Sequence, residues 1–183
     1  DLQKLLREMV DEGVSHAVLE VSSHALVQER VRGLRFQAAV FTNLTRDHLD
    51  YHGDFESYFE AKQRLFVDHL HPDGLAIVNL DDDHGSRLAH SLHPLRCRTF
   101  GSSPLAHYRP QELNISFQGV GFVCVTPSGT VRVHSPLVGL FNVSNLLGAI
   151  GALCALGLTA DEAASGVSSL PGVPGRMERI DLG

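Results

Sequence analysis

The chain has 183 residues, a net charge of -6 and 43% hydrophobic residues, which suits one globular domain. No basic stripe is visible, so we expect no duplex nucleic acid as a partner, and no run approaches the roughly 18 apolar residues of a membrane helix, so we expect no membrane partner. The first residues show no signal-peptide pattern. The cysteines are odd in number and widely spaced, which favours reduced thiols over a disulfide framework or a zinc site. Both observations predict a cytosolic protein.

Strand-like and helical segments alternate in the first half of the chain. The first helix is amphipathic, and Gly13 follows it as a stop. Asp54 is placed to cap the helix that follows a polar loop. We expect helices over 2–10, 25–32, 55–70 and 84–92, strands over 16–21, 36–42, 75–80 and 97–100, and a His- and Asp-rich loop over 43–53. This alternation predicts an α/β fold, with a mostly parallel sheet flanked by helices on both faces.

The pattern changes between residues 113 and 138, where apolar residues recur at every second position. Residues 127–129 separate two such runs and are typical of a hairpin turn. We therefore expect a small antiparallel sheet appended to the parallel one. A helix over 143–156 should follow with Asn142 as its cap, and another should begin at Thr159, where a capping box starts.

Polar residues follow the first two expected strands. Glu20 closes the first strand and is followed by Ser22. Asn43 closes the second strand, with Asp47 and His48 in the loop beyond. In open parallel sheets ligands bind at the carboxyl ends of the strands, so these two groups should face one crevice. Taken singly, Ser22 could instead cap a helix, and Asp47 could be a solvated loop residue.

Lys62 lies at the centre of the apolar stripe of its helix. The apolar residues spaced around it at helical periodicity are Phe55, Tyr58, Phe59, Leu65 and Phe66. A charged, unpaired lysine is costly there, so its amine either reaches the edge of the stripe or lies in a pocket where its pKa falls. A neutral amine can react with carbon dioxide to give a carbamate, which is an oxygen ligand suited to Mg²⁺. The periodicity leaves both outcomes open.

Five segments carry recognisable motifs, in order and over almost the whole chain. They are residues 20–30 (EVSSHALVQER), 42–53 (TNLTRDHLDYHG), 61–62 (AK), 139–145 (GLFNVSN) and 174–178 (PGRME). Together they resemble the central domain of the Mur ligase family. The Asn-Leu-Thr-x-Asp-His pattern is shared across that family, whereas the strings at 20–24 and 47–53 resemble its UDP-N-acetylmuramoyl-tripeptide synthetase branch.

The resemblance implies an ATP-dependent amide ligase of peptidoglycan synthesis, and hence of cell-wall formation, cell shape and division. Such a ligase phosphorylates the carboxylate of UDP-N-acetylmuramoyl-L-alanyl-D-glutamate, the UDP-MurNAc-dipeptide. The amine of a third amino acid, meso-diaminopimelate or L-lysine, then attacks the acyl phosphate. Mg²⁺ and positive side chains must stabilise the charge on the transferring phosphoryl oxygens.

The resemblance also implies a role for particular residues. It assigns a Mg²⁺ site to Glu20, His48 and Lys62 as a carbamate, contacts with the UDP-MurNAc-dipeptide to Ser22, Gln28 and Arg30, and contacts with ATP to Asn142, Asn145 and Arg176. Arg30 suits an anionic group through its fork of donors. Asn142 could instead serve only as a helix cap, and Arg176 could be a linker residue.

The glycine-rich phosphate loop of the family, G-x-x-x-x-G-K-[ST], does not occur in the chain. In the family that loop lies upstream of the position matching residue 1, and the domain that holds the incoming amino acid follows the central one. We therefore expect residues 1–183 to be the central domain of a longer enzyme, truncated on its N-terminal side and lacking the N- and C-terminal domains. The chain alone is expected to be inactive.

Two alternatives stay open. The first is another Mur-type ligase or a relative of cyanophycin or folylpolyglutamate synthetase. The second is a non-catalytic binding domain of the same fold. The retained Glu20, His48 and Lys62 argue against the second alternative, because a scaffold has no need of metal ligands.

Overall fold

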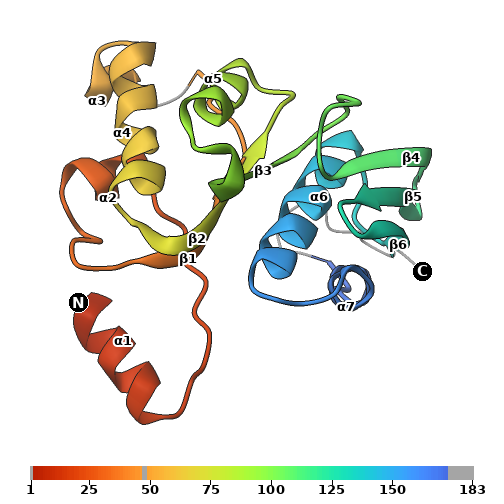
Figure 1. The fold of residues 1–183 in the computed structure, drawn as a ribbon, viewed down its shortest axis with the longest axis horizontal. Helices are drawn as coiled ribbons and strands as arrows, with labels where there is room; N and C mark the ends of the chain where they lie inside the picture. Colours follow the sequence, from red (N-terminus) through yellow and green to blue (C-terminus); the bar gives the residue numbers. More distant parts are fainter. Residues whose placement is uncertain (1, 47–48, 173–183) are drawn as a thin grey trace, which may run out of the picture. The chain divides into compact units, whose positions relative to one another are not determined.

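Residues 2–46 and 49–172 are described in the computed structural model (Figure 1). The chain divides into two compact units, Asp1–Phe36 with Arg46–Leu70, and Gln37–Thr45 with His71–Gly183. The described helices of the first unit are α1 (Leu2–Asp11), α2 (Ser23–Val27), α3 (Leu49–His52) and α4 (Phe55–Val67). Apart from the first residue of β1 and of β2, the second unit holds β1 (Phe36–Phe41), β2 (Leu70–Asn79), α5 (Asp83–Ser91), the 3-10 helix η1 (Pro94–Arg96), β3 (Cys97–Phe100), β4 (Arg109–Ser116), β5 (Gly119–Thr126), β6 (Gly129–Ser135), α6 (Leu140–Ala155) and α7 (Ala160–Ser168).

Helix α4 forms where the sequence predicts it. Asp54 caps its N-terminus, and the Oδ1 atom of Asp54 accepts a hydrogen bond from the Ser57 amide at 2.7 Å. Tyr58 and Phe59 on its apolar face are buried, and the helix packs against α2 (Figure 1). It ends at Val67 rather than at residue 70, because the chain enters β2 there.

The neighbouring helices differ more from the prediction. Helix α2 ends at Val27 instead of residue 32, and Glu29 just beyond it adopts a φ of 54°, which no α-helix contains. Helix α3 lies inside the segment 43–53 that was expected to be a loop. Helix α1 and the stop at Gly13, where φ is 78°, are confirmed.

The expected strand over 16–21 is wrong. Residues 14–22 belong to no strand or helix, Val18 is 96% exposed, and the sheet that contains β1 has the order β1-β2-β3. A strand is stabilised by hydrogen bonds to a neighbouring strand, and an apolar run alone does not supply them. Glu20 therefore does not close a strand in this structure.

Strands β1, β2 and β3 form a parallel sheet, which confirms the α/β prediction. The pairing of β2 with β3 runs from Ala76↔Cys97 to Asn79↔Phe100. Ala76, Ile77 and Val78 in the last part of β2 are fully buried, as is typical of a strand segment covered on both faces. Strand β2 begins at Leu70, before the expected residue 75. The prediction missed residues 70–74 because they carry no apolar pattern, whereas a strand pairs through its backbone.

Strands β4, β5 and β6 form the antiparallel sheet that the period of two predicts. The pairing of β5 with β6 ends at Thr126↔Gly129, so the expected hairpin turn lies between these residues. Helix α6 covers the inner face of this sheet (Figure 1). The buried core of the second unit consists of Ile77, Phe100, Tyr108, Val120, Phe122, Cys124, Val131, Val133, Val143, Leu146, Leu147, Ile150, Ala160, Ala163, Ala164 and Val167.

The start of α6 differs from the prediction, because Asn142 is not its cap. The helix begins after Gly139, whose φ of 100° is accessible mainly to glycine, and Asn142 is a residue of the first turn. The Asn142 side chain donates from Nδ2 to the Val138 carbonyl at 2.9 Å, which ties the helix to the preceding loop. The predicted capping box of α7 is confirmed, since Thr159 and Glu162 make both of its hydrogen bonds.

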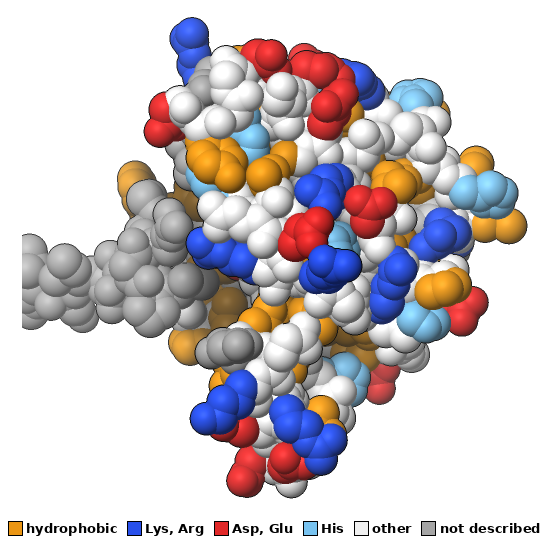
Figure 2. Space-filling model, turned by 90° about the vertical axis from the view of Figure 1, so that its left-hand side faces the viewer, with side chains coloured by type: hydrophobic (Ala, Val, Ile, Leu, Met, Phe, Trp, Pro, Cys, Tyr) orange, Lys and Arg blue, Asp and Glu red, His pale blue; other side chains and the backbone are white. Residues whose placement is uncertain are grey.

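The face of the molecule drawn in Figure 2 carries basic and acidic side chains intermixed, with hydrophobic side chains between them. No large field of a single charge sign is visible on that face. Within residues 2–46 and 49–172, no helix is both long enough and apolar enough to cross a membrane.

Candidate active site

The carboxyl edge of the parallel sheet carries a network of polar side chains. Buried Asn79, the last residue of β2, donates from Nδ2 to the Thr42 carbonyl at 2.7 Å. One carboxylate oxygen of Asp82 accepts a hydrogen bond from the Leu44 amide at 2.9 Å. The ends of β1 and β2 therefore meet, as expected for neighbouring parallel strands.

The end of β3 joins the same network through Asp81. Its two carboxylate oxygens accept hydrogen bonds from the Ser102 amide at 2.9 and 2.8 Å, and Oδ1 also accepts one from the Ser102 hydroxyl at 2.8 Å. Gly101 makes this approach possible, because a Cβ there would lie 2.8 Å from the Asp81 Oδ1.

Asn43 after β1 was predicted from the sequence to lie at this edge, whereas Asn79, Asp81 and Asp82, at and after the end of β2, were not. The same rule would have found them, because they lie at or just beyond the end of β2, whose residues 75–78 are apolar.

A second cluster, of imidazole and phenol rings, lies in the first unit. His52 stacks on Tyr58, with ring centroids 5.0 Å apart and an interplanar angle of 18°. The His52 Nε2 and the Ser23 hydroxyl share a hydrogen bond of 2.9 Å. The His24 ring lies 4.1 Å from that of Tyr51, centroid to centroid. These contacts join α2, α3 and α4, and they were not predicted from the sequence.

Lys62 lies beside this cluster. Its side chain is half-buried on α4, and its Nζ atom lies 5.4 Å from the centroid of the Tyr58 ring, within the range of a cation–π contact. The apolar neighbours predicted from periodicity are largely confirmed, since Tyr58, Phe59 and Phe66 are buried while Phe55 is exposed. The protein therefore shields the amine in part from bulk water.

The residues expected to contact the dipeptide substrate lie around α2. Ser22 caps this helix, as its position also allowed, and its hydroxyl accepts a hydrogen bond from the Ala25 amide at 3.2 Å. Gln28 and Arg30 follow the helix and are exposed. Glu20 precedes it and is exposed as well. The four residues share one unit, although Glu20 is not at a strand end.

The residues expected near ATP lie at the start of α6 in the second unit. Asn145 donates from Nδ2 to the Asn142 Oδ1 at 3.2 Å, so the two predicted side chains are in contact. Asn142 is buried, whereas Asn145 is exposed. His48, Asp47 and Arg176 lie outside the described residues.

A metal-ion cluster is not formed by the described part of the chain alone. Among residues 2–46 and 49–172, no three His, Cys, Asp or Glu side chains group closely enough to hold a metal ion. The predicted Mg²⁺ site draws on His48 and on a carbamate of Lys62, neither of which enters such a group.

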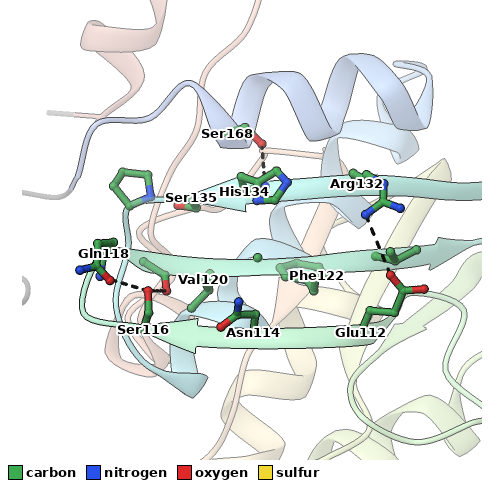
Figure 3. A pocket seen from close by; sticks show the side chains of 14 residues that line it. Glu112, Asn114, Ser116, Gln118, Val120, Phe122, Arg132, His134, Ser135 and Ser168 are labelled. Carbon is green, nitrogen blue, oxygen red and sulfur yellow. Dashed lines mark hydrogen bonds and ion pairs between the residues drawn. The ribbon is translucent and has the colours of Figure 1, made fainter.

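A groove of about 580 Å³ lies on the outer face of the antiparallel sheet (Figure 3). Asn114, Arg132 and His134 point into it (Figure 3), and Gly121, which has no side chain, also lines it. Glu112 reaches Arg132 across the groove at 4.0 Å. None of the residues predicted from the sequence to bind substrate, ATP or metal lines this groove.

Comparisons with known proteins agree with the fold and the motifs. Residues 1–153 match the family described as the Mur ligase middle domain. The chain is 49% identical over 180 residues to the UDP-N-acetylmuramoyl-L-alanyl-D-glutamate--2,6-diaminopimelate ligase of Gloeobacter violaceus, covering 98% of this chain and 36% of that protein. It is 48% identical over 187 residues to the ligase of the same name in Geobacter metallireducens, covering 99% of this chain and 36% of the relative.

A solved structure of a UDP-N-acetylmuramoyl-L-alanyl-D-glutamate--2,6-diaminopimelate ligase is similar in fold. It superposes with a TM-score of 0.86 at 39% sequence identity, over 96% of this chain and 36% of that one. The chain thus spans about a third of the length of the curated relatives it matches.

Proposed function

The chain belongs to the Mur ligase family, through the family's middle domain, and we propose that it forms the catalytic centre of an ATP-dependent ligase in the cytosol. The substrate is UDP-N-acetylmuramoyl-L-alanyl-D-glutamate, and the incoming amino acid is 2,6-diaminopimelate. The choice of diaminopimelate rather than L-lysine is supported by the names of the relatives, which share nearly half of their residues with this chain.

The reaction forms an amide in two transfers. The substrate carboxylate attacks the terminal phosphorus of ATP, releasing ADP and forming an acyl phosphate. The amine of diaminopimelate then attacks the acyl carbon, loses a proton and displaces inorganic phosphate. Positioning and electrostatic stabilisation are what a protein contributes to phosphoryl transfer.

The binding residues expected from the sequence keep their roles in this proposal. Ser22, Gln28 and Arg30 bind the UDP-MurNAc-dipeptide, and Asn142, Asn145 and Arg176 bind ATP. Arg30 and Arg176 carry fixed positive charge that suits carboxylate and phosphate groups. The contact between Asn142 and Asn145 supports a shared role, because each amide orients the other.

Glu20, His48 and the carbamate of Lys62 would hold Mg²⁺. The donor set fits this ion, because a carboxylate and a carbamate supply the hard oxygens that Mg²⁺ prefers. When bound, the ion neutralises charge on the phosphoryl oxygens. The position of Lys62 supports the proposal most directly, since its side chain is half-buried on α4 beside the Tyr58 ring.

The test is replacement of Lys62 in the full-length protein that carries this chain. Lys62→Ala should lower the rate of ATP-dependent tripeptide formation by about 100- to 1,000-fold, as the loss of a charge-stabilising group does. Added short carboxylates should restore part of the rate by supplying the missing oxygens. The matched control is Lys4→Ala, because Lys4 is the other lysine of the chain and forms an exposed ion pair with Glu8. A Lys62→Ala rate equal to that of wild type would refute the bridging role.

A further inference from the structure

The two carboxylate oxygens of Asp82 bind two different segments. Oδ1 accepts a hydrogen bond from the Gly85 amide at 2.9 Å and thereby caps α5. Oδ2 accepts one from the Leu44 amide at 2.9 Å, in the segment that follows β1. A cap needs only one oxygen, so the second bond is an additional function of this carboxylate.

The Asn79 side chain also binds this segment. Its Nδ2 donates to the Thr42 carbonyl at 2.7 Å, and its Oδ1 accepts from the Asp81 amide at 2.9 Å. Asn79 is 8% exposed, so losing either partner would leave a buried polar atom unsatisfied. Thr42 and Leu44 lie beyond the end of β1, so these backbone groups are held by side chains at and just after the end of β2 rather than by backbone pairing within the sheet.

We infer that Asn79 and Asp82 are positioning residues for the segment 42–45, which leads to the proposed metal ligand at position 48. This role rests on the proposed function. By fixing the Thr42 carbonyl and the Leu44 amide, the two side chains reduce the conformations open to the segment, which lowers the entropy cost of bringing its ligand to the metal. Groups that orient metal ligands in this way typically change metal affinity or activity by roughly 10- to 100-fold when removed.

The hydrogen bonds that hold the Thr42 carbonyl and the Leu44 amide are called the clamp here. Asp82→Ser separates the cap of α5 from the part of the clamp at Leu44. Serine is as good a helix cap as aspartate, so the bond to the Gly85 amide is kept. Its single short oxygen cannot also reach the Leu44 amide, so that part of the clamp is lost. The matched control is Asp54→Ser, which makes the same change at the cap of α4, where Asp54 is exposed and its Oδ1 accepts from the Ser57 amide.

Two measurements on the full-length protein test the inference. Hydrogen exchange followed by mass spectrometry reads the backbone of 42–46, and titration with Mn²⁺, followed by electron paramagnetic resonance, reads metal affinity without depending on catalysis. In Asp82→Ser, exchange in this segment should become faster and Mn²⁺ affinity should fall roughly 10-fold or more. Asp54→Ser should leave both unchanged.

Either of two results overturns the inference. One is unchanged exchange over 42–46 in Asp82→Ser, which would mean that no clamp exists. The other is faster exchange with unchanged Mn²⁺ affinity, which would mean that the clamp does not act on the metal site. Failure of the proposed function has a different signature, namely a wild-type protein that binds Mn²⁺ but forms no tripeptide.

Discussion

Gly85 packs directly against the backbone carbonyl of Asn79. A Cβ at position 85 would lie 2.0 Å from the Asn79 oxygen and 3.4 Å from the Phe41 ring. The obstacle is backbone, which cannot move without displacing the end of β2. The glycine therefore lets α5 begin immediately beside the polar network at the carboxyl edge of the sheet.

Gly85→Ala should for this reason destabilise the chain, against the usual preference for alanine in helices. Overpacking of this kind costs about 1–3 kcal/mol, whereas alanine in an open helical position gains about 0.5–1 kcal/mol. Gly166→Ala in α7 is the matched control, because a Cβ there meets nothing within 4 Å. Urea unfolding should show opposite signs for the two variants. A stabilised Gly85→Ala would show that α5 does not pack so closely against β2.

Local features of the fold could be predicted from the sequence, and non-local ones could not. The cap at Asp54 and the capping box at Thr159 depend on residues within one helical turn, and both are confirmed. The strand over 16–21 depended on a neighbouring strand that no local pattern can reveal, and it is absent from the described structure. The start of α6 failed for a different reason. Asn142 has a side chain typical of a cap, but the helix starts three residues earlier, after Gly139.

The candidate site divides in the same way. The unusual position of Lys62 followed from the periodicity of its own helix, and its half-buried side chain agrees with it. The hydrogen bonds from Asn79 to Thr42 and from Leu44 to Asp82 require β1 and β2 to lie side by side. These partners are 37 and 38 positions apart in the chain, so no local pattern reveals them. The stacking of His52 on Tyr58 likewise depends on how α3 packs against α4.

The two roles of Ser22 can be separated by substitution. Ser22→Asp keeps an oxygen that can cap α2, so stability should change little, whereas Ser22→Ala should cost about 1 kcal/mol. A new carboxylate beside the anionic UDP-MurNAc-dipeptide should raise the KM for that substrate by about tenfold or more, since like charges repel. Steady-state kinetics and urea unfolding of both variants check this. An unchanged KM in Ser22→Asp would leave Ser22 as a helix cap only.

The buried cysteines should resist alkylation. Burial raises the pKa of Cys97 to about 11 and that of Cys124 to about 12, so both are neutral thiols at neutral pH, and the thiolate is the reactive form. Cys154 is half-buried, and burial raises its pKa as well. Iodoacetamide should modify Cys154 first and the other two only on unfolding, as followed by mass spectrometry with and without urea. Rapid modification of Cys124 in the folded chain would contradict the packing of β5 against α6.

The capping box of α7 should make stability depend on pH. The Glu162 carboxylate accepts a hydrogen bond from the Thr159 amide at 2.8 Å, and this bond and a second one from the Thr159 hydroxyl lower the pKa of Glu162 below its ordinary value. A lowered pKa means that the stabilising contribution is present above the pKa of the unfolded chain and is lost as the pH falls through the folded value. Wild type should therefore exceed Glu162→Gln in urea midpoint at neutral pH, and the difference should vanish in acid. A difference that stays constant with pH would assign the effect to packing rather than to charge.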